Sequence, residues 1–132
     1  MAAWLLKTEP STYSFADLVR AGTAPWDGIA NRAALAHLAK AAVGDTCVIY
    51  HTGKETAAVG LATIARAAYP DPADPSLRIV DITAGRALAK PVTLATLKSD
   101  PAFADSPLVR QGRLSFVPLT SAQLARIRKL GA

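Results

Sequence analysis

Residues 46–65, TCVIYHTGKETAAVGLATIA, contain two apolar runs separated by a polar turn. The first run, Thr46–Tyr50, and the second, Ala57–Ala65, have the length and residue types of β-strands. The turn over His51–Glu55 joins them, so the segment predicts an antiparallel hairpin. Gly60 lies inside the second strand and indicates either a bulge or a close approach by another part of the chain.

Further strand and helix signals surround this hairpin without alternating strictly. The remaining predicted elements are strands over 3–8, 77–83 and 113–117 and helices over 15–21, 32–43, 94–99 and from 121 onward. The residues predicted to cap these helices are Ser14, Asn31, Thr93 and Thr120. Leu18 and Val19 are expected on the inner face of the first helix, and residues 101–112 are expected to be irregular. About five strands and four short helices in this order predict a small α+β domain or a partly closed barrel.

Composition and charge limit the class of protein. The 132 residues are 51% hydrophobic and 19% charged, as in a single core-forming globular domain. Residues 1–105 carry ten basic and ten acidic side chains, whereas residues 106–132 carry five basic side chains and no acidic one. The whole net charge of +5 therefore lies in the last fifth of the chain. This suits either a polyanionic partner or an ordinary helix terminus with two surface arginines.

The chain offers few signals for other classes. A single cysteine, Cys47, excludes an internal disulfide framework and a cysteine-rich zinc site, and it fits a reducing cytoplasm. We expect its thiol to be inert in the core. No apolar stretch approaches the ~20 residues of a membrane span, and the N-terminus does not resemble a signal peptide. We therefore expect a cytoplasmic protein that needs no membrane, metal or cofactor.

Catalytic patterns are weak. No glycine-rich phosphate loop and no nucleophile elbow occurs in the sequence. His51 with Asp27 or Glu9 would make an acid–base pair, but His51 is equally a polar residue at a strand end. Trp26 follows a proline and precedes Asp27-Gly28 in a predicted loop over 23–30. A large aromatic there either anchors the loop or offers a stacking face for a ligand.

A series of motifs in the same order resembles the EVE domain family. They are WLLKTEP at 4–10, WDGI at 26–29 followed by Asn31, YHT at 50–52, YPDP at 69–72, KPVTL at 90–94 and LVRQGRLS at 108–115. The resemblance implies a single EVE domain over residues 1–132, related to small bacterial proteins and to the thymocyte nuclear protein family. It also implies a PUA-like pseudo-barrel of about five to six mixed strands with short flanking helices.

The family resemblance also implies a pocket for one nucleobase. It assigns base binding to Lys7, Thr8, Glu9, Trp26, Asp27, Gly28, Asn31, Tyr50, His51 and Thr52. It assigns contacts with the nucleic-acid backbone to Arg32, Arg110, Arg113 and Ser115. Many family members have an arginine before the asparagine and a tyrosine after it, where this chain has Ala30 and Arg32. Either the contacts of the missing arginine are lost, or Arg32 replaces them.

The predicted function is a monomeric, non-enzymatic module that binds DNA or RNA through one modified base, such as a methylated cytosine or adenine. The alternative is a small-molecule-binding protein or an enzyme that uses His51 as acid or base. A third possibility is a structural adaptor without a ligand, which a closed or apolar-filled pocket at Trp26 would favour.

Overall fold

The computed structural model describes residues 2–132, which form six strands, five α-helices and one short 3-10 helix. The strands are β1 (Ala3–Thr8), β2 (Thr23–Trp26), β3 (Thr46–His51), β4 (Ala57–Pro70), β5 (Arg78–Thr93) and β6 (Phe116–Leu119). The helices are α1 (Phe15–Ala21), α2 (Arg32–Leu38), α3 (Leu94–Ser99), the 3-10 helix η1 (Pro101–Phe103), α4 (Pro107–Arg110) and α5 (Ser121–Leu130). No helix within these residues is long and apolar enough to cross a membrane.

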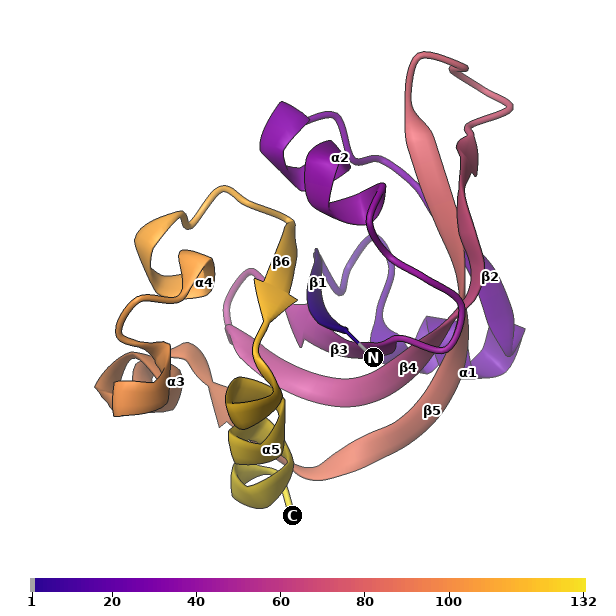
Figure 1. Ribbon diagram of the computed structural model, residues 1–132. Helices are drawn as coiled ribbons and strands as arrows, with labels where there is room; N and C mark the ends of the chain where they lie inside the picture. The colour runs from indigo at the N-terminus through magenta and orange to yellow at the C-terminus, as the bar shows by residue number, and fades with distance from the viewer. Residues whose placement is uncertain (1) are drawn as a thin grey trace.

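The strands form one mixed sheet in the order β2-β5-β4-β3-β1-β6. β1 and β3 are parallel, and the other neighbouring pairs are antiparallel. Figure 1 shows the sheet curling around, with α3, α4 and α5 on one side of the molecule and α1 on the other. Within residues 2–132, the edge strands β2 and β6 do not pair with each other, so the barrel stays open. The expected α+β fold with a partly closed barrel is confirmed.

The core lies between the curved sheet and its helices. Leu5 and Leu6 of β1 and Val48 of β3 are fully buried in it. Trp4 is also buried, and its indole N–H donates a hydrogen bond of 3.0 Å to the Asp45 carboxylate. Cys47 is buried beside them, and burial raises the pKa of its thiol, in agreement with an inert core cysteine.

Gly60 has both features that the sequence predicts. The register in which β4 pairs with its neighbours shifts next to Gly60, both toward β3 and toward β5. The Phe15 ring of α1 also lies directly against it, because a Cβ atom at Gly60 would be only 2.4 Å from two ring atoms. Gly60 therefore allows α1 to pack closely on β4.

The predicted helix caps are all confirmed. Ser14 and Asp17 form a reciprocal capping box at the start of α1. The Asn31 side chain accepts a hydrogen bond of 3.0 Å from the Ala34 N–H at the start of α2. Thr93 and Thr120 cap α3 and α5 in the same way. Short-range hydrogen bonding thus sets where these helices begin.

Several strand predictions are wrong. The predicted loop over 23–30 begins with strand β2, which pairs with β5. β4 and β5 extend well beyond the predicted 57–65 and 77–83, because bulges let one pairing continue past residues that interrupt the apolar pattern. The strand predicted over 113–117 is displaced to Phe116–Leu119.

The helix predictions need three corrections. The helix predicted over 32–43 ends at Leu38, where a turn begins. Residues 101–112, expected to be irregular, contain η1 and α4. Val19 is 51% exposed instead of facing inward, because the two-turn helix α1 buries only Phe15 and Leu18 on the sheet.

Candidate functional site

A cavity of about 550 Å³ opens beside Trp26, and we call it the Trp26 cavity. Its lining comes from the end of β1, the segment that follows it, β2 with the turn after it, and the residue before β6. The lining residues are Lys7, Thr8, Thr12, Tyr13, Ala24, Pro25, Trp26, Asp27, Gly28, Ile29 and Ser115. Its volume falls within the ~300–1,000 Å³ of typical small-ligand sites.

Trp26 forms the innermost aromatic wall of the Trp26 cavity. It is the last residue of β2, where its backbone is paired with Val80 of β5. Only 6% of Trp26 is exposed. The Tyr13 ring meets it edge-to-face, with ring centroids 6.0 Å apart and planes at 77°. Trp26 therefore anchors this end of β2 and also borders the cavity, whereas its role as a stacking face for a ligand stays a prediction.

The turn after β2 brings polar groups to the mouth of the cavity. Asp27 and Gly28 are exposed there, whereas Ile29 is buried beneath them. Gly28 has φ +80°, a left-handed conformation that residues other than glycine rarely adopt. The segment after β2 therefore adds one acidic residue, Asp27, and one apolar residue, Ile29, to the lining of the cavity.

The end of β1 supplies the opposite, polar wall. Lys7 is half-buried, and burial lowers the pKa of its ammonium group. Its Nζ donates a hydrogen bond of 2.9 Å to the Gly112 carbonyl and lies 5.9 Å from the centroid of the Tyr50 ring. The Thr8 hydroxyl donates a hydrogen bond of 2.6 Å to the Tyr13 carbonyl. Lys7 thus places a cation at the cavity and holds the turn before β6 beside it.

The structure brings six of the predicted site residues to the Trp26 cavity. They are Lys7, Thr8, Trp26, Asp27, Gly28 and Ser115. The predicted residues that do not line it are Glu9, Asn31, Arg32, Tyr50, His51, Thr52, Arg110 and Arg113. The sequence prediction missed the other five lining residues, which are Thr12, Tyr13, Ala24, Pro25 and Ile29. Ile29 is the last residue of the quoted motif WDGI, and the other four could have been indicated only by their closeness in sequence to the quoted motifs.

The predicted residues at the end of β3 and just after it, Tyr50, His51 and Thr52, have structural contacts. Tyr50 is buried, which raises its pKa to about 12. The Thr52 N–H donates a hydrogen bond of 2.9 Å to the Thr8 carbonyl. His51 accepts a hydrogen bond of 3.0 Å at Nε2 from the Phe15 N–H. His51 is therefore not placed in the cavity that Asp27 lines, and the structure does not assemble the acid–base pair of His51 with Asp27.

The remaining predicted residues lie around the cavity or away from it. Glu9 is exposed, and its carboxylate accepts a hydrogen bond of 3.2 Å from the Ser11 N–H. Arg32 and Arg113 are exposed, next to the turn after β2 and next to Ser115 respectively. The Arg110 guanidinium forms an ion pair of 2.9 Å with Asp105. Within residues 2–132, Arg32 and Arg113 form no ion pair, whereas Arg110 is paired with Asp105 at the surface.

Two other hollows differ in character from the Trp26 cavity. One of about 660 Å³ lies between the β3–β4 turn and α3 and includes Lys54 and Lys98. The other, of about 580 Å³, lies between β5 and the end of α5 and includes Arg86 and Arg128. Neither is lined by an aromatic side chain. Within residues 2–132, no group of His, Cys, Asp or Glu side chains is arranged to hold a metal ion.

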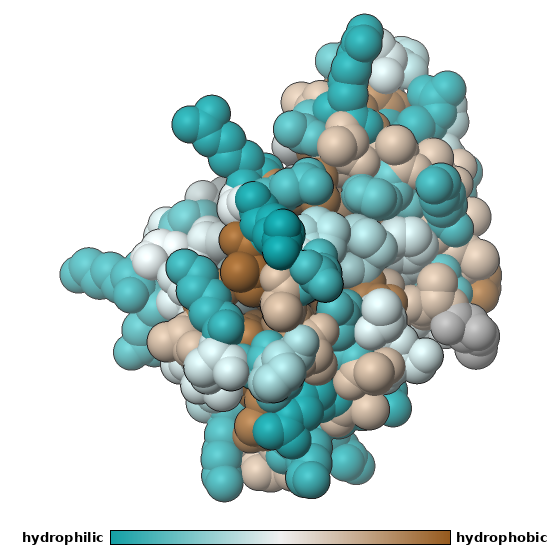
Figure 2. All heavy atoms as spheres, turned by 60° about the vertical axis from the view of Figure 1, so that its left-hand side comes forward, coloured by the Kyte–Doolittle hydropathy of each residue, from teal (hydrophilic) through white to brown (hydrophobic). Residues whose placement is uncertain are grey.

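The face that carries α3 and α4 shows no large apolar surface. Figure 2 brings this face forward, and hydrophilic side chains cover most of it, with hydrophobic atoms in small areas between them. The Trp26 cavity is thus the site where aromatic, apolar and charged groups converge.

Comparisons with known proteins agree with this architecture. The sequence profile of the EVE domain matches residues 2–130, whereas no curated protein matches the chain. A protein from Rhodopseudomonas palustris is 39% identical, with a TM-score of 0.92 over 99% of this chain and 93% of that chain. A protein from Pseudomonas syringae is 33% identical, with a TM-score of 0.93 over 99% of this chain and 100% of that chain.

A third similar structure is that of human THYN1 in complex with DNA that contains 5-methylcytosine. It is 27% identical to this chain, with a TM-score of 0.90. The match covers 99% of this chain and 98% of the THYN1 chain. The family profile and these solved structures extend over nearly the whole chain. The chain belongs to the EVE domain family.

Proposed function

We propose that this chain is a nucleic-acid-binding module that holds one modified base in the Trp26 cavity. The observation that carries the proposal is the composition of this cavity. The half-buried Tyr13 ring and the largely buried Trp26 ring line it, and Lys7 and Asp27 add one charged residue of each sign to the lining. The crystal structure of the family member THYN1 with methylated DNA supports nucleic acid as the ligand class.

The polar groups of the cavity fit the edge of a base. The Lys7 ammonium donates hydrogen bonds and the Asp27 carboxylate accepts them. Cytosine and adenine each present an exocyclic amine that donates, beside a ring nitrogen that accepts. An amine facing Asp27 and an acceptor facing Lys7 would therefore satisfy both side chains.

The apolar part of the lining suits a methyl group. Ala24, Pro25 and Ile29 lie next to Trp26 in the same cavity. Burying one methyl group against such a wall contributes about 0.8 kcal/mol, or roughly a fourfold gain in affinity. Base stacking on the aromatic rings adds about 1–3 kcal/mol, and this term does not depend on the methyl group.

Two exposed arginines are the proposed contacts with the nucleic-acid backbone. Arg113 follows Gly112, which Lys7 holds by a hydrogen bond, and Arg32 opens α2 after the turn that carries Asp27. Each phosphate contact with a single strand contributes about 0.7 to the slope of log affinity against log salt concentration. Replacing either arginine with alanine should therefore weaken binding and flatten that slope.

Titration with labelled oligonucleotides tests the proposal. Single-stranded DNA and RNA with one central modified base are compared with the same sequences carrying the plain base, by fluorescence anisotropy. We expect the modified base to bind about fourfold more tightly. Tyr13→Ala should weaken binding about fivefold or more, and Asp27→Asn should weaken recognition of the amine.

The matched control is Lys98→Ala, at the hollow beside α3, which should leave affinity within about twofold. Trp26→Phe keeps an aromatic ring in this buried position and should fold while weakening binding. Oligonucleotides that all fail to bind would refute the proposal. Binding that Lys98→Ala abolishes and the Tyr13 and Asp27 variants leave unchanged would place the site elsewhere.

A further inference from the structure

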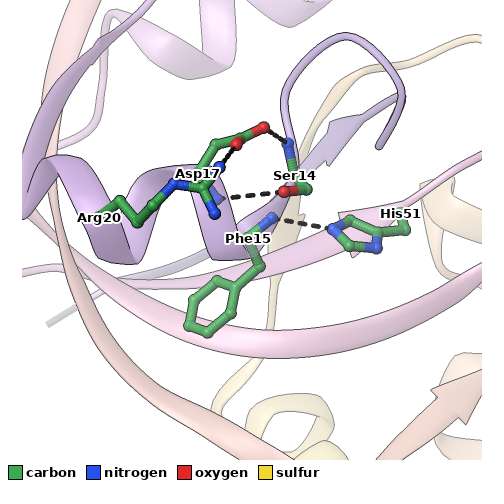
Figure 3. A network of polar contacts seen from close by, with 5 residues as sticks. All are labelled: Ser14, Phe15, Asp17, Arg20 and His51. Carbon is green, nitrogen blue, oxygen red and sulfur yellow. Dashed lines mark hydrogen bonds and ion pairs between the residues drawn. The ribbon is translucent and has the colours of Figure 1, made fainter.

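His51 binds the N-terminus of α1 and not the Trp26 cavity. It is the last residue of β3, and Figure 3 shows its imidazole directed at the backbone nitrogen of Phe15. Nε2 accepts the Phe15 N–H over 3.0 Å. The first N–H groups of a helix lack partners within the helix, so His51 supplies one from the sheet. A ring nitrogen that accepts carries no proton, so the contact requires the neutral imidazole with its proton on Nδ1.

This contact also fixes one wall of the Trp26 cavity. Tyr13, which lines the cavity, lies two residues before Phe15. The Tyr13 N–H donates to the Glu9 carbonyl over 2.9 Å, and the Tyr13 carbonyl accepts from the Thr8 hydroxyl over 2.6 Å. β1 therefore holds Tyr13 from one side, and His51 of β3 holds the chain just beyond it.

We propose that neutral His51 is a positioning residue for the Trp26 cavity, which keeps Tyr13 in place by holding the Phe15 N–H. Protonation of His51 releases this contact and weakens base binding. The binding part of this inference rests on the proposed function, whereas the link between His51 and Tyr13 exists in the free protein.

Protonation is incompatible with the contact for two reasons. A proton on Nε2 replaces the acceptor with a donor that faces the Phe15 N–H. The resulting cation also faces a helix N-terminus, which carries partial positive charge. The neutral form is favoured because burial lowers the pKa of His51, although the nearby Glu9 carboxylate acts in the opposite direction.

Charged residues also occur on the elements next to His51. They are Lys7 on β1, which pairs with β3, Asp17 and Arg20 on α1, which form an ion pair, and Lys54 and Glu55 in the β3–β4 turn. The charged group that shifts the pKa of His51 is the Glu9 carboxylate. The pKa of His51 lies below its ordinary value of 6.5, so the neutral imidazole that makes the contact predominates at neutral pH and is lost as the pH falls through the acid range.

The expected loss of affinity has an upper bound. If the protonated protein does not hold the base, the apparent Kd rises in proportion to one plus the ratio of protonated to neutral His51. A pKa below 6.5 makes this ratio smaller than about ten at pH 5.5. The affinity should therefore fall by no more than about tenfold between pH 7.5 and 5.5, and the further the pKa lies below 6.5, the smaller is this fall.

The test compares the wild type with His51→Gln and His37→Gln across this pH range, using one oligonucleotide with a modified base. A glutamine carbonyl can accept the Phe15 N–H and does not titrate. His37→Gln is the matched control, because His37 is the other histidine and lies on α2 near Trp4. The wild type and His37→Gln should lose affinity at low pH, whereas His51→Gln should bind almost equally at all pH values.

Equal pH profiles of the wild type and His51→Gln would overturn the inference. A readout without ligand separates this outcome from failure of the proposed function. In the free protein, the Phe15 and Tyr13 amide resonances should shift together as His51 titrates, and His51→Gln should remove both shifts. A Tyr13 resonance that does not respond to His51 would overturn the positioning role, whether or not any oligonucleotide binds.

Discussion

Replacement of Gly60 with alanine should destabilise the fold through a single contact. The added Cβ atom would lie 2.4 Å from Cε1 and Cζ of Phe15 and 2.7 Å from Cδ1. Carbon atoms pack best at about 3.5–4.0 Å, so the ring would have to move by more than about 1 Å. Phe15 cannot move freely, because it is buried and its N–H is bonded to His51.

The size of the effect follows from two opposing terms. Overpacking in a well-packed core costs about 1–3 kcal/mol. Alanine regains about 0.5–1 kcal/mol relative to glycine in a strand, because the unfolded chain loses conformational freedom. We therefore expect a net loss of about 1–2 kcal/mol in the free energy of unfolding for Gly60→Ala.

Urea unfolding of Gly60→Ala and Gly112→Ala measures the steric term directly. A Cβ atom at Gly112 would meet no atom within 4 Å. This control therefore reduces the conformational freedom of the unfolded chain in the same way but introduces no clash. Gly60→Ala should be less stable than the control by about 1–3 kcal/mol. Phe15→Leu removes the clashing ring atoms, so the double variant should be more stable than additivity predicts, by about 1 kcal/mol. Equal stability of the two glycine variants would refute the packing argument.

Three further predictions concern other parts of the fold. Asp45 accepts hydrogen bonds from Trp4 Nε1 and from two backbone N–H groups, so Asp45→Ala should cost about 3 kcal/mol in urea unfolding. Asp45→Asn should cost less, and equal losses would contradict a role as shared acceptor. Thr120→Ala removes the N-cap of α5 and should lower the free energy of unfolding by about 1 kcal/mol. The control Ser121→Ala, at the next residue, should change the free energy of unfolding by less than about 0.5 kcal/mol. Burial raises the pKa of Cys47, so a thiol reagent at mildly alkaline pH should label it only after unfolding; rapid labelling of the native protein would contradict its burial.

Features set by neighbouring residues could be predicted from the sequence. Ser14 and Thr120 bond to backbone groups three residues away, so their capping role is readable without knowledge of the tertiary structure. Gly60 stands out because glycine is unfavourable inside a strand unless another group needs the space. The Phe15 ring that fills this space comes from a distant part of the sequence, and its identity could not be predicted.

β2 shows why other elements could not be predicted. The segment Thr23–Trp26 contains a proline and lacks a strand-like pattern, and it becomes a strand only by pairing with distant residues of β5. A proline is tolerated there because β2 lies at the edge of the sheet. Long-range pairing therefore places Trp26, the residue on which the candidate site depends.

The candidate site was predicted only in part for a geometric reason. The family motifs place Lys7, Thr8 and the Trp26 turn correctly around one cavity. The sequence prediction assigns Tyr50 and His51 to the same base-binding site. Successive side chains of a strand point to opposite faces of the sheet, so these two cannot both face one cavity. Tyr50 accordingly lies under Lys7, whereas His51 meets α1.

The two tryptophans provide the most direct test of the Trp26 cavity. An oligonucleotide with one modified base is titrated into the isotope-labelled protein, and the two indole N–H resonances are followed by NMR. The Trp4 indole is buried and bonded to Asp45, so it serves as an internal control. We predict that the Trp26 resonance shifts with the modified base, shifts less with the plain base, and that the Trp4 resonance stays in place. Binding that leaves the Trp26 resonance unchanged would contradict the proposal that this cavity holds the base.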